Sequence, residues 1–211
     1  MKKIHNCEVS IEKLLLSLKY RINNLIFGGA KGANKMRKIL IVVDMQNDFI
    51  DGALGTKEAV AIVDNVVKKI NDFEGEIFVT LDTHFDNYME TSEGKNLPVP
   101  HCIKGTNGWQ LNSKVNEALE KKSYTIVEKL TFGSVDLPSL IANKFGLDDL
   151  DIELIGLCTD ICVVSNALLL KANFTEANMT VDASCCAGVT VEKHQAALET
   201  MKSCQIKVIN E

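Results

Sequence analysis

The sequence predicts an α/β domain, a three-layer αβα sandwich built on a six-stranded, mainly parallel sheet. Short, continuously apolar runs alternate along the chain with segments whose apolar residues recur at helical spacing. Continuous apolar runs are typical of strands that are buried on both faces, as in parallel sheets. Regular alternation of strands with helices places the helices on the two faces of such a sheet.

Each element follows from a local pattern. The run KILIVV opens the domain as a buried strand, and the next segment has a helical period with Thr56 as its N-cap and Glu58 in its first turn. Gly146 is expected to end a later helix. Strands are expected at 38–43, 76–81, 124–129, 151–157, 179–183 and 205–211, and helices at 56–73, 111–121, 137–146, 160–174 and 190–203. The polar stretch from Asp82 to Gly108 is too long for an idle connection, and long loops of this kind usually carry function.

Composition narrows the class of protein and its partners. The chain has 211 residues, 46% of them hydrophobic, and a net charge of −5 without a dense Lys/Arg block, so DNA and RNA are not expected partners. No apolar run is long enough to span a bilayer, so no membrane association is expected. Seven cysteines, an odd number without a CxxC pair, argue against a disulfide framework and for a reducing cytoplasmic location.

The first 35 residues differ from the rest, and the compact domain is expected to span 36–211. Residues 1–35 contain leucines and isoleucines at helical spacing followed by GGAKGANK, without the features of a signal peptide. One hypothesis is an upstream-extended gene start, because Lys31-Gly32-Ala33 can be encoded by a ribosome-binding sequence shortly before a Met36 codon. The alternative is a peripheral amphipathic helix that docks on the domain or on a partner.

Polar residues follow the predicted strands at the edge of the sheet where ligands bind in such folds. Asp44 follows the first strand, Lys129 ends the third, and Cys162 follows the fourth. A thiol at the first turn of a helix and beside an ammonium is expected to have a lowered pKa, and a carboxylate can accept its proton. Taken singly, Asp44 is equally compatible with a helix cap or ion-pair partner, Lys129 with a solvated surface lysine and Cys162 with a buried core thiol. Their joint placement at three strand ends favours a nucleophilic site.

Five motifs identify a family resemblance that covers about Arg37 to Asn210. They are VVDMQNDF, DTH, PHCIKGTNGWQL, VEKLTFGS and GLCTDICV, in this order. With them the chain resembles the isochorismatase-like cysteine hydrolases, and among these the nicotinamidase (pyrazinamidase) branch. The resemblance implies a catalytic triad of Asp44, Lys129 and Cys162 and a thioester intermediate. It also implies an oxyanion site formed by the backbone N–H groups of Cys158 and Cys162, and a cis peptide at Leu157–Cys158.

A second group of polar residues indicates a metal site in the 82–108 stretch. Asp82, His84 and His101, with Glu93 between them, offer two imidazoles and two carboxylates, a set that suits zinc, iron or manganese. The resemblance implies that such an ion holds the pyridine nitrogen of the substrate. Glu90 is the second choice for the fourth ligand, and a polar loop without metal is the alternative.

The remaining candidates receive structural roles. Asp160 is expected to cap the helix that follows it, and Thr159 to help hold the turn. His194 is expected to be a helix-surface or capping residue. Cys102, Cys185 and Cys186 are expected to be packed thiols, and the substrate pocket is expected to include Phe49 and Leu157, with Trp109 and Phe132 as further candidates.

The resemblance implies hydrolysis of a small-molecule amide, most simply nicotinamide to nicotinate and ammonia. One departure concerns the substrate: LPVPH has no aromatic residue before the proline–histidine step, where several nicotinamidases have one. Alternatives are another small amide or ureido hydrolase of the superfamily and a non-catalytic small-molecule-binding relative. The apolar helix faces also allow a homo-oligomer.

Overall fold

The computed structural model describes residues 36–211, which form one compact unit from Met36 to Glu211. The hypotheses on residues 1–35 lie outside the described part. The sheet has six strands in the order β3-β2-β1-β4-β5-β6, and every pair is parallel. The strands are β1 (Arg37–Val43), β2 (Glu76–Asp82), β3 (Tyr124–Lys129), β4 (Leu150–Leu157), β5 (Asn178–Ala187) and β6 (Lys207–Ile209). The predicted α/β fold class is confirmed.

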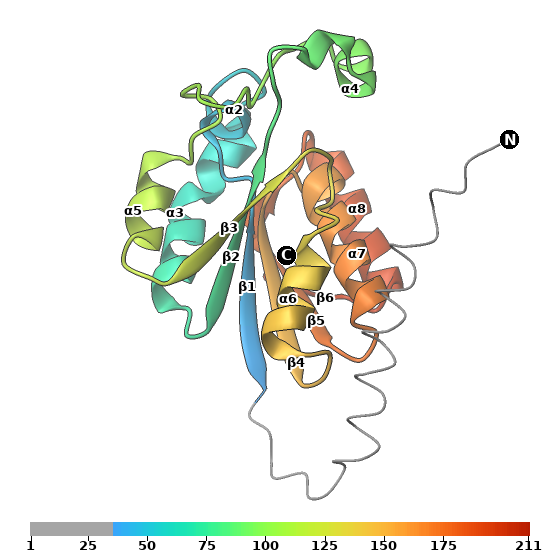
Figure 1. Cartoon of the computed structure of the whole chain (residues 1–211). Helices are drawn as coiled ribbons and strands as arrows, with labels where there is room; N and C mark the ends of the chain where they lie inside the picture. The colour runs from blue at the N-terminus through green and yellow to red at the C-terminus, as the bar shows by residue number, and fades with distance from the viewer. Residues whose placement is uncertain (1–35) are drawn as a thin grey trace, which may run out of the picture. The chain divides into compact units, whose positions relative to one another are not determined.

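Helices cover both faces of this sheet (Figure 1). One face carries α2 (Asn47–Ile50), α3 (Lys57–Asp72) and α5 (Ser113–Leu119), and the other carries α6 (Leu137–Phe145), α7 (Val164–Asn173) and α8 (Val191–Ser203). No helix within 36–211 is both long and apolar enough to cross a membrane.

The alternating side chains of β1 supply one core on each side of the sheet. Ile39, Ile41 and Val43 pack with α6, α7 and α8, whereas Leu40 and Val42 pack with α3 and α5. All five are completely buried. Because successive side chains of a strand point to opposite faces, a central parallel strand must be apolar throughout.

The sheet register brings the carboxyl ends of the central strands to one level. Val43 pairs with Thr80 of β2 and with Gly156 of β4, and Asp82 pairs with Lys129. Gly156 has a φ of +117°, and a Cβ there would lie 2.1 Å from the carbonyl oxygen of Val43. This position therefore requires glycine, because no other residue allows β4 to approach β1 so closely.

Several element predictions are confirmed and others need correction. Thr56 caps α3 by accepting a hydrogen bond from the Ala59 N–H, and Gly146 follows the last residue of α6. The helix expected at 160–174 instead begins as a π-helix, η2 (Thr159–Val163), and continues as α7. The expected loop at 82–108 contains η1 (Tyr88–Glu90) and α4 (Ser92–Asn96), because Thr91 caps a short helix through the Gly94 N–H.

Candidate active site

Asp44 lies directly after β1, with its side chain completely buried. Its φ of 47° is in the left-handed region, which aspartate tolerates better than most residues. The Thr80 hydroxyl donates to Asp44 Oδ1 at 2.6 Å. The sharp turn after β1 therefore directs a carboxylate into the interior and fixes one of its oxygens.

The Lys129 ammonium, at the end of β3, is the centre of the cluster. Its Nζ lies 2.7 Å from Asp44 Oδ2, 3.0 Å from Asp82 Oδ1 and 3.5 Å from Cys162 Sγ. The structure thus brings together the three residues that the sequence placed at separate strand ends. Burial opposes the charged ammonium, but Asp44, Cys162 and Asp82 outweigh it and raise the pKa of Lys129. The lysine is a permanent cation.

Asp44 keeps one oxygen able to accept a proton. Although Lys129 is an ion-pair partner of Oδ2, this buried oxygen receives no well-aligned hydrogen bond. Burial raises the pKa of Asp44, and Lys129 opposes this effect only in part. A buried carboxylate with a raised pKa is suited to general acid–base chemistry.

Cys162 lies in η2 and is 4% exposed. The prediction of a lowered pKa is wrong: burial, together with Asp44, raises the pKa of Cys162 well above its ordinary value, and Lys129 only opposes this. The sequence showed the helix start and the lysine but not the degree of burial. At neutral pH the sulfur is therefore a thiol, and it shares the Lys129 ammonium with the Asp44 carboxylate.

The turn that carries Cys162 has the expected cis peptide at Leu157–Cys158. The Cys158 carbonyl accepts from the N–H groups of Ile161 and Val163, at 3.0 and 3.1 Å. The prediction that Asp160 caps the helix is wrong, because its Oδ1 accepts instead from the Val189 N–H at 2.9 Å. Thr159 does hold the turn, and its partner is His194.

Asp82, His84, Glu93 and His101 form a group that could hold a metal ion, and their ligand atoms all lie within 4.8 Å of one another. The His84 Nε2 is 3.0 Å from Asp82 Oδ2, and the His101 Nε2 is 3.6 Å from Glu93 Oε1. Of the two glutamates considered, Glu93 belongs to the group, whereas Glu90 is exposed in η1.

The electrostatics of this group favour a cation at its centre. Burial raises the pKa of Glu93, and the nearby Asp82 carboxylate raises it further. Burial also acts to raise the pKa of Asp82, but hydrogen bonds with His101 and His84 outweigh it and hold this pKa far below its usual range. The His101 Nδ1 lies 2.8 Å from the Val99 carbonyl, which leaves Nε2 facing the group. One buried and one half-buried carboxylate together with two imidazoles fit a divalent ion such as zinc.

Cys162 and the four residues of the metal group line one cavity of about 760 Å³, and Asp44 and Lys129 lie behind the sulfur, outside its lining. Phe49 and Leu157 line it, as expected, and the Phe49 ring contacts the His101 ring edge-on at 5.4 Å between centroids. Phe132 also lines the cavity, whereas Trp109 donates through Nε1 to Thr83 and is not among its lining residues. Further apolar lining residues that the sequence did not single out are Leu54, Leu97, Leu130, Ile161 and Val189.

Two buried amides that support the site were missed in the sequence. Gln46 bonds both the N–H and the carbonyl of Asp82, and Asn166 donates to the Cys162 carbonyl at 2.8 Å. Asn166 also accepts from the Ser134 N–H. The available signal was weak: Gln46 is one of two neighbouring amides in VVDMQNDF, and Asn166 lies on a helix with other polar residues.

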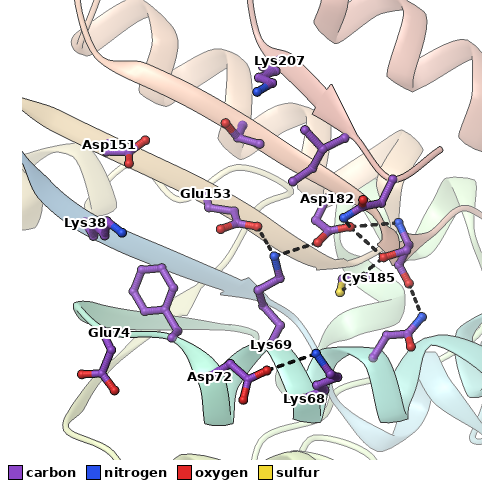
Figure 2. Close-up of a pocket in the computed structure, with 16 residues that line it drawn as sticks. Lys38, Lys68, Lys69, Asp72, Glu74, Asp151, Glu153, Asp182, Cys185 and Lys207 are labelled. Carbon is purple, nitrogen blue, oxygen red and sulfur yellow. Dashed lines mark hydrogen bonds and ion pairs between the residues drawn. The ribbon is translucent and has the colours of Figure 1, made fainter.

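A second cavity of about 790 Å³ lies over α3, β4 and β5 and contains none of these residues (Figure 2). Its central charges neutralise one another: Lys69 Nζ is 2.6 Å from Glu153 Oε1 and 2.8 Å from Asp182 Oδ2. These pairs lower the pKa of Asp182 and raise that of Lys69, in both cases against burial. The arrangement ties α3 to the sheet.

The fold and the first cluster together define an α/β protein with a buried cysteine at the carboxyl edge of a parallel sheet. The chain belongs to the isochorismatase family: the model of the isochorismatase domain matches residues 38–211. Among similar proteins, the nicotinamidase/pyrazinamidase of Mycobacterium tuberculosis is 27% identical in an alignment of 191 positions that covers 82% of this chain and 98% of that protein.

The solved structures that resemble this chain are also nicotinamidases and pyrazinamidases. The nicotinamidase/pyrazinamidase PncA from Bacillus subtilis has a TM-score of 0.72 and 27% identity, covering 83% of this chain and 100% of that one. The pyrazinamidase of Pyrococcus horikoshii in complex with zinc has a TM-score of 0.67 and 26% identity, covering 83% and 99%. The predicted resemblance to isochorismatase-like hydrolases of the nicotinamidase branch is confirmed.

Proposed function

We propose that this protein is a cysteine-dependent amidohydrolase that converts nicotinamide to nicotinate and ammonia. One observation carries the proposal: a single buried ammonium, that of Lys129, contacts both the Cys162 sulfur and the Asp44 carboxylate. The cavity onto which Cys162 opens also contains the metal-binding group. The similarity to nicotinamidases supports this substrate.

Asp44 moves the protons in the proposed reaction. Its carboxylate takes the proton of Cys162 as the sulfur attacks the amide carbon, and backbone N–H groups at Cys158 and Cys162 stabilise the oxyanion. Asp44 then gives the proton to the departing nitrogen, and the C–N bond breaks to leave ammonia and a thioester. In the second half Asp44 accepts a proton from water, whose oxygen attacks the thioester, and the sulfur recovers a proton on release of the acid.

Lys129 has an electrostatic role in this scheme. Its fixed charge stabilises negative charge on the sulfur and on Asp44 in turn, which lowers the cost of moving the proton between them. Removing the charge would leave two neighbouring acids without a counterion in a buried site.

The metal group has a positioning role. We propose that Asp82, His84, Glu93 and His101 hold a divalent ion, which when bound would supply a Lewis-acidic contact to the pyridine nitrogen. The Phe49 ring, which contacts the His101 ring edge-on, then helps to orient the pyridine ring of the substrate.

The test is release of nicotinate and ammonia from nicotinamide by the metal-loaded protein. Cys162→Ala is expected to abolish turnover, whereas Cys204→Ala, which changes an exposed cysteine far along the chain, should retain it. Absence of turnover by the parent protein at millimolar nicotinamide would reject the substrate.

A second candidate is hydrolysis of a larger amide or ureido compound by the same residues. The cavity of about 760 Å³ is more than a single-ring amide fills, and Leu97 and Leu130 add apolar lining to it. A panel of aromatic, aliphatic and carbamoyl amides, ranked by kcat/KM, distinguishes the two candidates.

We further propose that the enzyme acts in the cytoplasm without nucleic-acid or membrane partners, and that it forms a homo-oligomer. The reasons are the cysteine content, the balance of charge and the exposed apolar side chains near the cavity, such as Leu130 and Phe132. Sedimentation velocity would measure the oligomeric state.

A further inference from the structure

The turn that carries Cys162 is held by a segment from the far end of the chain. This segment comprises Gly188, Val189 and Thr190 and the first turn of α8, and it follows the strand β5. Two consecutive residues of the turn, Thr159 and Asp160, make hydrogen bonds to it. These residues lie between Cys158 and Cys162, the positions proposed for oxyanion binding and nucleophilic attack.

The first of the two connections is between Thr159 and His194. The Thr159 side chain is fully buried, and its hydroxyl lies 2.8 Å from the His194 Nδ1. Burial lowers the pKa of His194, so the imidazole is neutral at neutral pH, and its Nδ1 makes a hydrogen bond with the Thr159 hydroxyl as acceptor or donor according to the tautomer. A buried hydroxyl without this partner would lose a hydrogen bond that water does not replace.

The second connection requires a close approach of the two segments. Asp160 Oδ1 accepts from the Val189 N–H at 2.9 Å, and a Cβ at Gly188 would lie 2.9 Å from both Asp160 Oδ1 and the His194 backbone nitrogen. Any larger residue at 188 would push the turn and α8 apart. Glycine here permits the contact between Thr159 and His194.

We propose that His194 is a positioning residue for the nucleophile, holding Thr159 and, through it, the turn that places the Cys162 sulfur beside Lys129. The proposal rests on the proposed function, in which this sulfur attacks the substrate. His194 itself touches no reacting atom and does not line the catalytic cavity. Its effect is therefore expected on the rate of the chemical step rather than on substrate binding.

Matched substitutions test both partners of the contact. Thr159→Val and His194→Leu remove the hydrogen bond at similar side-chain volume, whereas Thr159→Ser keeps the hydroxyl and His194→Asn keeps a polar atom near the Nδ1 position. We expect the first two to lower kcat about tenfold with KM changed less than twofold, since a small misplacement of a reacting group is costly. The second two should retain most of the activity, and the Thr159→Val/His194→Leu double variant should be no slower than either single variant.

A readout independent of any substrate is the alkylation rate of Cys162 by iodoacetamide at one alkaline pH, resolved by peptide mass spectrometry. In Thr159→Val and His194→Leu we expect this rate to fall several-fold, because the sulfur moves away from the Lys129 ammonium that stabilises its thiolate. If the parent protein does not hydrolyse nicotinamide, the proposed function fails, while this comparison still decides the role of His194.

Two results would overturn the proposal. One is that Thr159→Val and His194→Leu both keep the kcat and the Cys162 alkylation rate of the parent protein. The other is a loss of activity that parallels a fall in the urea unfolding midpoint and is not restored by Thr159→Ser or His194→Asn, which would make the contact structural only.

Discussion

The Cys162 thiol is subject to two opposing influences, burial beside a carboxylate and contact with an ammonium. Burial and Asp44 prevail, so the pKa of Cys162 lies above its ordinary value and the group is protonated at neutral pH. Since the thiolate is the species that reacts, alkylation of substrate-free Cys162 should be slow at pH 7 and should still be rising beyond about pH 8.5, where a free cysteine is half ionised. Peptide-resolved iodoacetamide labelling between pH 6 and pH 10, in the range where the protein stays folded, measures this.

Lys129→Met provides the control for this pH dependence. Lys129 lowers the pKa of Cys162, so its loss should move the labelling profile to still higher pH. A labelling rate that reaches its plateau below pH 7 in the parent protein would contradict the raised pKa and would favour a preformed thiolate.

The two glutamates of the metal loop give a second residue-scale prediction. Glu93 belongs to the group with Asp82, His84 and His101, whereas Glu90, three residues earlier, is exposed. Glu93→Gln should weaken binding of a divalent ion about tenfold or more, and Glu90→Gln should leave it unchanged. Titration of the chelator-treated protein with zinc, followed by equilibrium dialysis and metal analysis, checks both variants; equal affinities would exclude Glu93 as a ligand.

At the scale of elements, Lys69 joins α3 to two strands of the sheet. Its ammonium lies between Glu153 of β4 and Asp182 of β5, and the Asp182 side chain is 2% exposed (Figure 2). Lys69→Met would leave Asp182 without its cation inside the protein. We expect a loss of about 2 kcal/mol in the free energy of unfolding, below the loss for a fully buried pair because Lys69 keeps some contact with water.

Lys68→Met is the matched control in urea denaturation. Lys68 is the neighbour of Lys69 in α3 and pairs with Asp72 at 3.1 Å, but both side chains are largely exposed. Its loss should change the unfolding free energy by less than about 0.5 kcal/mol. Equal effects of the two substitutions would refute the role given to Lys69, and both variants should retain the parental kcat because neither residue reaches the catalytic cavity.

At the scale of the whole molecule, the sequence predicts the sheet because buried parallel strands appear in it as short, continuously apolar runs. The strand β1 from Ile39 to Val43 and the strand β4 from Leu154 to Leu157 are buried on both faces and therefore read as apolar runs. The helix α3 has its N-cap in Thr56. Asp44, Lys129 and Cys162 were found by the same logic, since the strand ends of a parallel sheet share one edge.

What the sequence does not predict are relations between segments far apart in the chain. Asp160 has the pattern of a helix cap, yet its partner is the Val189 N–H, 29 residues away. His194 and Lys69 have the spacing of exposed helix positions, and only the fold gives them a buried hydroxyl and a buried carboxylate as partners. The raised pKa of Cys162 likewise depends on how completely distant segments enclose it.

The last prediction concerns the span of the chain that folds. Both cores, all six strands and every residue of the proposed site lie between Met36 and Glu211. A protein that begins at Met36 should therefore fold with a urea midpoint close to that of the full chain and should keep its kcat, because the 36–211 unit has its own closed core. Circular dichroism and ammonia release, measured on both proteins at equal metal content, make the comparison. An unfolded or inactive shorter protein would assign residues 1–35 an essential role in the domain, against the boundary that the sequence predicts at Met36.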